Sequence, residues 1–202
     1  MHKIIHNCKV TVSAGLYFAA AFLVLTLPIK WLTAAFISAV IHELFHIAAI
    51  RLWKLQIHSI RIGIGGTQIQ TEPMSHVQEL VCALAGPAGG LTLLLFARNI
   101  PRIALCAAFH SLYNLLPIYP SDGGRALRCG AKLIFPDQIA DNIYEAIETG
   151  FLVCVTLLGV FGSFVLHLGL YPMLIALILV GRKLKMKMSL QTGRTQGTID
   201  VL

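Results

Sequence analysis

The sequence contains little charge. Asp, Glu, Lys and Arg make up 12% of its 202 residues, whereas 56% are hydrophobic and the mean hydropathy is +0.76. These values exclude an ordinary soluble domain, which carries about twice as much charge. The apolar residues occur in long runs, and a segment that crosses a bilayer needs about 20 of them. The composition therefore predicts a membrane protein.

Ordered cysteine patterns are also missing. The five cysteines are scattered without a CxxC pair, which excludes a disulfide framework and paired-cysteine metal or redox motifs. The chain has no internal repeat and no low-complexity segment. We expect one unit over residues 1–188, followed by a short polar cytoplasmic tail at residues 189–202.

Six apolar runs predict an all-α polytopic membrane protein with six transmembrane helices. The runs lie at roughly 11–29, 32–50, 78–97, 102–119, 149–168 and 171–181. Lys3 and Lys9 precede the first run, as in a signal peptide. However, this run is long and no small-x-small cleavage site ends it, so we favour a retained span.

The placement of basic residues predicts the topology. With the N-terminus inside, 13 of the 16 Lys and Arg residues fall on the cytoplasmic side and three on the other. This bias satisfies the positive-inside rule and places both termini in the cytoplasm. It also accounts for the basic charge without a nucleic-acid partner, while the basic run after residue 181 can contact anionic headgroups of the lipid bilayer.

Acidic residues are scarce, and two of the nine fall inside or at the edge of a predicted span. These are Glu43 and Asp122. The others fall in predicted loops or at span ends: Glu72, Glu79, Asp137, Asp141, Glu145, Glu148 and Asp200. Because a charge at membrane depth is costly, Glu43 and Asp122 are the acidic candidates for function.

Glu43 belongs to an H-E-x-x-H motif with His42 and His46. Residues four apart share one face of a helix, so both imidazoles can bind one metal ion. A catalytic Zn²⁺ accepts imidazole nitrogen and lowers the pKa of a water molecule to about 7, and a neighbouring carboxylate can take the proton. The motif therefore predicts a hydrolytic zinc site with Glu43 as general base.

A catalytic zinc usually has three protein ligands, and the third must come from elsewhere in the chain. Asp122, His110 and His167 are the candidates. We favour Asp122, because the predicted topology places it at the same membrane depth as His46. It follows a segment broken by Pro117 and Pro120, and irregular backbone at membrane depth requires a polar cavity.

Two motifs resemble the site-2 protease family of intramembrane metalloproteases, especially the bacterial branch that includes the sporulation sigma-factor-processing protease. They are His42-Glu43-Leu44-Phe45-His46, and Asn114-Leu115-Leu116-Pro117 followed by Asp122-Gly123-Gly124. The resemblance covers roughly residues 30–130. It implies one Zn²⁺ held by His42, His46 and Asp122, with Glu43 as the base. Asn114 would either stabilise charge on the scissile carbonyl or tie the broken helix together.

The chain departs from the family pattern at two positions. Ser121 stands where the family commonly has Leu, and Gly90 stands where a Gly-Pro-x-x-Asn element has Asn. The second departure puts a polar role at that position in doubt, while small residues and a proline still suit helix packing. We expect no accessory domain within the chain, and therefore control by partner membrane proteins or by prior trimming of the substrate.

Residues 55–71 alternate between apolar and polar side chains around Gly65 and Gly66, which predicts a membrane-associated β-hairpin between the second and third spans. The alternation slips near Ser59, which indicates a bulge. The alternative is a plain loop. In the resembling family such a strand lies near the active site, where its free edge could hold substrate.

These features favour an intramembrane zinc metalloprotease that cleaves membrane-anchored proteins near the cytoplasmic face of the cell membrane. A pro-sigma or anti-sigma factor would be a suitable substrate for the branch that the motifs resemble. Two alternatives remain open: a polytopic metal-ion transporter that uses the same His and Asp residues, and an inactive membrane adaptor. The sequence leaves the substrate and the oligomeric state open.

Overall fold

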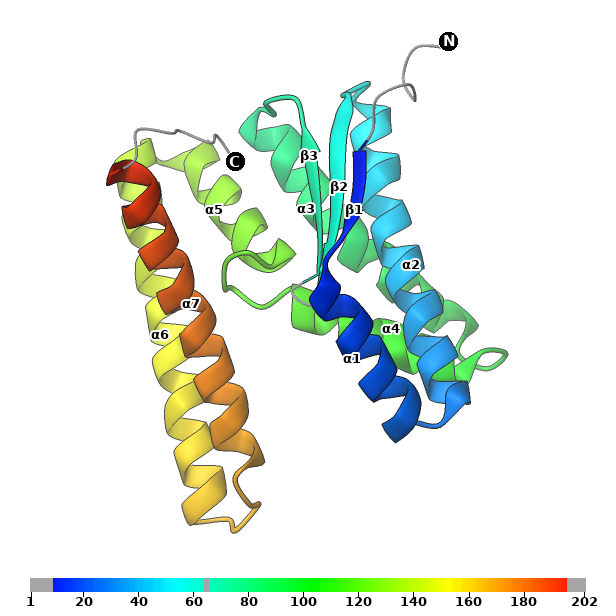
Figure 1. Ribbon diagram of the computed structural model, residues 1–202. Coiled ribbons are helices and arrows are strands. Elements are labelled where there is room, and N and C mark those ends of the chain that lie inside the picture. Colours follow the sequence, from blue (N-terminus) through cyan, green and yellow to red (C-terminus); the bar gives the residue numbers. More distant parts are fainter. Residues whose placement is uncertain (1–8, 64–65, 196–202) are drawn as a thin grey trace.

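The computed structural model describes residues 9–63 and 66–195 and is mostly helical (Figure 1). Three strands form a small sheet beside the first helices, in the order β1-β2-β3. Strand β1 (Lys9–Val12) pairs in parallel with β2 (Ile57–Gly63), which pairs in antiparallel fashion with β3 (Gly66–Thr71).

The predicted hairpin is confirmed as β2 and β3. Their register shifts between Ile57 and Ser59, where the alternation of the sequence slips. Gly66 has φ +114°, a conformation that glycine adopts readily. The sequence did not predict β1, because its four residues are too few to show a period and its pairing with β2 spans more than 40 residues of chain.

Within the described residues, three helices are long and apolar enough to cross a membrane: α2 (Ile29–Leu52), α3 (His76–Thr92) continued by the 3₁₀ helix η1 (Leu93–Phe96), and α6 (Asp137–Phe164). The apolar helix α1 (Ala14–Thr26) and the apolar part of α7 (Tyr171–Thr195) are shorter. Helix α4 (Pro101–Asn114) has only 14 residues. The six-span arrangement therefore stays a prediction beyond these three.

Two helices extend beyond the apolar runs of the sequence. Helix α6 begins at Asp137, ahead of the run at 149–168, so Glu148 lies buried within a helix and not in a loop. Helix α7 continues to Thr195, into the segment expected to be a polar tail, while residues 196–202 lie outside the described part of the chain.

Helices α2, α3 and α4 pack against one another beside the sheet, while α6 and α7 run side by side as a separate hairpin (Figure 1). Helix α5 (Asp122–Ile134) contacts both α3 and α6. One apolar cluster, built around Ala49, Ile50 and Cys82, joins α2 and α3 to the sheet. A second joins the loop after α4 to α6 and α7 through Ile118, Leu152 and Leu179.

Large apolar side chains cover much of the outer surface. Examples from four helices are Phe18, Phe36, Leu157 and Ile178, each more than half exposed. Soluble monomers rarely expose apolar area on this scale, whereas a lipid environment favours it. The exposed surface therefore agrees with the three apolar helices in indicating a membrane protein.

Candidate metal centre

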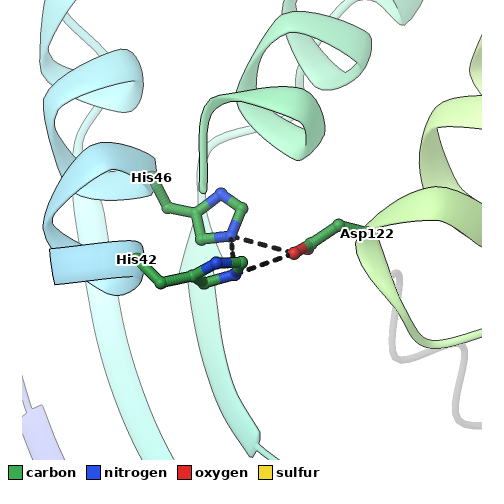
Figure 2. A group of neighbouring side chains, drawn as sticks. All are labelled: His42, His46 and Asp122. Atoms are coloured by element: carbon green, nitrogen blue, oxygen red, sulfur yellow. Dashed lines mark hydrogen bonds and ion pairs between the residues drawn. The ribbon is translucent and has the colours of Figure 1, made fainter. Parts of the chain in front are cut away.

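Helix α2 presents His42 and His46 on one face, as the spacing predicts (Figure 2). Both imidazoles are buried, and their Nε2 atoms lie 3.2 Å apart. Asp122, the first residue of α5, points toward them from the opposite side. Its Oδ2 atom lies 3.0 Å from Nε2 of His42 and 3.2 Å from Nε2 of His46.

The three atoms have the spacing of a zinc ligand set. Ligands about 2.0–2.1 Å from a tetrahedral zinc ion lie roughly 3.3 Å from one another. The observed separations of 3.0, 3.2 and 3.2 Å are close to that value. His42, His46 and Asp122 are a group that could hold a metal ion, with all ligand atoms within 4.8 Å of one another.

The protonation of the histidines favours a cation. Nδ1 of His46 donates a hydrogen bond to the Cys82 carbonyl at 2.7 Å, so in neutral His46 the Nε2 atom carries a lone pair. That lone pair faces Nε2 of His42 and the Asp122 carboxylate. The lone pair and the carboxylate share a buried site, and a bound Zn²⁺ would balance their negative charge. The residues present therefore fit the metal.

The loop before α5 explains the Asp-Gly-Gly motif. Ser121 caps the helix by accepting a hydrogen bond from the Gly124 amide at 3.4 Å, and its hydroxyl also contacts the Leu116 and Ile118 carbonyls. A Cβ on Gly123 would overlap the backbone of Leu115, and one on Gly124 would overlap that of Ile118. Both glycines let the loop fold onto the helix start, and this fold brings Asp122 to the histidines.

Helix α3 closes the third side of the centre with small residues. A Cβ on Gly86 would overlap the Nε2 atoms of both His46 and His42. A Cβ on Gly90 would overlap the Ser111 hydroxyl, so the family's Asn has no room at this position in the structure. Sequence reasoning treated these residues as packing sites. The structure places Gly86 directly against the candidate ligands.

Glu43 lines the same cavity and is partly buried. Thr67 of β3 lines the cavity beside it. The sheet therefore approaches the site at the carboxylate that the motif predicts to be the base. The cavity has a volume of about 120 Å³ and opens among α2, β3 and the loop after α4.

The remaining candidates differ in position. Asn114 lines the cavity, and its Nδ2 atom donates to the His110 carbonyl at 3.1 Å, so it ties the end of α4 together. His110 packs edge-on against His42, with ring centroids 4.6 Å apart, but it lies outside the group of three ligand atoms. His167 follows the end of α6 and is not among the residues that line the cavity.

Sequence reasoning missed Glu148. This carboxylate is 6% exposed and accepts a hydrogen bond from the Tyr119 amide at 3.0 Å, three residues before Asp122. The hydropathy pattern left it just outside the apolar run at 149–168, because Asp137, Asp141 and Glu145 precede it. The spacing of four residues between Tyr144 and Glu148, which places both on one face of a helix, could have indicated that they interact.

No family model and no curated protein sequence matches the chain. Among solved structures, the fold is similar to that of a site-2 protease from Methanocaldococcus jannaschii, with a TM-score of 0.59 and 20% sequence identity. The match covers 89% of this chain and 90% of the other. The chain therefore shares the fold of a site-2 protease over nearly its whole length.

Proposed function

We propose that the protein is an intramembrane zinc metalloprotease that cleaves membrane-anchored proteins. The main support is that His42, His46 and Asp122 converge on one point, in a cavity that Glu43 also lines. Both histidines lie on α2, a helix apolar enough to cross a membrane, and the fold is similar to that of a site-2 protease. A metal-ion transporter has no comparable support.

The proposed roles follow from position. His42, His46 and Asp122 would hold Zn²⁺, which when bound supplies a Lewis acid and lowers the pKa of water to about 7. Glu43 would accept a proton from the attacking water and return it to the nitrogen of the departing amine. Asn114, whose amide now holds the His110 carbonyl, would reorient to stabilise charge on the scissile carbonyl.

The edge strand β3 supports a mode of substrate binding. Its Gly66, Thr67 and Ile69 line the cavity, and within the described residues no strand pairs with its outer edge. A substrate helix must unwind before its peptide bond can reach Glu43, and an extended segment can then pair with a free edge. We infer that substrate adds to β3 as a fourth strand.

The setting of the reaction is part of the proposal. We place both termini and the cavity opening on the cytoplasmic side, as the distribution of basic residues predicts. Control would come from other membrane proteins. The motifs favour pro-sigma or anti-sigma factors as substrates, and we extend the proposal to them on that resemblance alone.

The test is cleavage of a single-span substrate by purified protein in lipid vesicles, with zinc content measured in parallel. Glu43→Gln should bind zinc normally but cleave roughly 10²–10⁴-fold more slowly, since it removes the general base. Glu145→Gln, the same change at an exposed position of α6, should leave the rate unchanged. Normal cleavage by Glu43→Gln would refute the mechanism, and a chain that binds no zinc would refute the proposed function.

A further inference from the structure

Glu148 is a buried carboxylate in one of the helices apolar enough to cross a membrane. A charge in that setting is costly unless it is paired and hydrogen-bonded. Its Oε1 atom accepts hydrogen bonds from the Tyr144 hydroxyl at 2.9 Å and the Tyr119 amide at 3.0 Å. Its Oε2 atom lies 3.0 Å from Nζ of Lys183 on α7. Both oxygens therefore have partners.

These contacts connect the α6–α7 hairpin to the loop that carries Asp122. Lys183 belongs to α7 and also donates to Thr149 Oγ1 at 2.7 Å, so the two helices are joined at this level. Beside it, Ile118 packs against Leu152 and Leu179. The loop is thus held to the hairpin by one apolar cluster and by the bond from the Tyr119 amide to Glu148.

The hydrogen bond from the Tyr119 amide to Glu148 lies three residues before Asp122. Ile118 and Ser121 flank it, and the Ser121 amide donates to the Ile118 carbonyl at 2.9 Å. Ser121 in turn caps the helix whose first residue is Asp122. A shift of the Tyr119 backbone is therefore passed within three residues to the carboxylate that completes the metal site. Metal binding tolerates errors of only about 0.2 Å in ligand position.

We propose that Glu148 is a positioning residue for the candidate metal centre: by accepting the Tyr119 amide it holds the loop so that Asp122 meets His42 and His46. This inference rests on the proposed function, because it assigns Glu148 a purpose in metal binding. Glu148 touches no metal ligand and acts through the loop backbone. Lys183 neutralises its charge.

Two double variants separate the hydrogen bond from the charge. Glu148→Gln with Lys183→Met removes the ion pair but keeps an oxygen that accepts the Tyr119 amide. Glu148→Leu with Lys183→Met removes the ion pair and the acceptor at similar volume. We expect the Leu variant to bind zinc at least about tenfold more weakly than the Gln variant, with kcat reduced and KM little changed. Glu145→Leu, at an exposed position of the same helix, is the control.

Hydrogen exchange of the backbone amides of Tyr119 and of residues 121–124 provides a readout that needs no zinc. The Leu variant should exchange faster there than the Gln variant, with equal exchange in α2. Equal zinc affinity and equal loop exchange in the two double variants would overturn the inference. If the unmodified protein binds no zinc, the proposed function fails, and unchanged loop exchange would separately refute the role of Glu148.

A third variant covers the case in which the Leu variant does not fold. Glu148→Asp keeps the charge for Lys183 but shortens the side chain by one methylene, so its oxygen withdraws from the Tyr119 amide. We expect faster loop exchange and weaker zinc binding than in the unmodified protein. Values equal to those of the unmodified protein would overturn the inference.

Discussion

Replacing Gly86 by alanine tests whether helix α3 leaves only enough room for the candidate ligands. The new Cβ would lie 2.7 Å from Nε2 of His42 and 2.6 Å from Cε1 of His46, whereas ordinary contact begins at 3.4 Å. The methyl group and the imidazoles therefore overlap by about 0.7 Å or more. Both rings line the cavity, so turning away from the methyl group would carry their Nε2 atoms off the ligand positions.

The expected loss follows from the tolerance of metal sites. Ligands must lie within about 0.2 Å of their ideal distances, and the overlap exceeds this several-fold. We expect Gly86→Ala to weaken zinc binding by roughly 100-fold, equivalent to about 2.7 kcal/mol. Cleavage should fall at least in proportion to zinc occupancy.

The measurement is zinc affinity by competition with a chelating dye, in detergent and in vesicles. Gly150→Ala in α6 is the matched control, because a Cβ at this helical position would meet nothing within 4 Å. It should retain zinc affinity and gain a few tenths to about 1 kcal/mol of stability from helix propensity. If Gly86→Ala binds zinc as tightly as Gly150→Ala, the reasoning about space at the centre is wrong.

Three further predictions concern α5 and the loop before it. Gly124→Ala should lower zinc affinity because its Cβ would overlap the Ile118 backbone. Gly130→Ala should leave the affinity unchanged, because a Cβ there would have no atom within 4 Å. Equal affinities of the two variants would contradict this account of the loop. Ser121→Ala should lower the thermal midpoint through loss of a helix cap worth about 1 kcal/mol, and an unchanged midpoint would argue against the cap. Burial, assisted by nearby Glu79, raises the pKa of Cys129 to about 12. In a variant that keeps Cys129 as its only cysteine, the thiol should therefore be alkylated very slowly at pH 8 and about tenfold faster with each unit of rising pH. Fast alkylation at pH 8 would show that the Cys129 thiol is not buried.

The local parts of the candidate site could be predicted from the sequence. His42 and His46 share a face because a helix turns every 3.6 residues, and this holds wherever the helix lies. The hairpin and its irregularity near Ser59 were visible because a strand alternates with period two. Such features depend on neighbours in the chain, so hydropathy and spacing reveal them.

Features that depend on distant segments could not be predicted in this way. Strand β1 pairs with residues about 50 positions later, and Glu148 is buried by Tyr119 and Lys183, which lie 29 and 35 positions away from it. A hydropathy profile assigns a charged residue to a loop or a span end, because it does not include the hydrogen-bond and ion-pair partners that distant residues supply. The buried carboxylate was missed for that reason.

The sequence by itself determined that the chain has long apolar helices and that one of them carries a pair of histidines with an adjacent carboxylate. It also identified Asp122 as the favoured third ligand, on charge placement and motif. Only the tertiary structure decided that Oδ2 of Asp122 lies 3.0 and 3.2 Å from the two imidazoles. That meeting depends on the capped turn at Ser121, on two glycines that allow close backbone contact, and on the room that Gly86 leaves across the centre. Van der Waals contact between segments far apart in the chain sets these distances, and no local pattern records them.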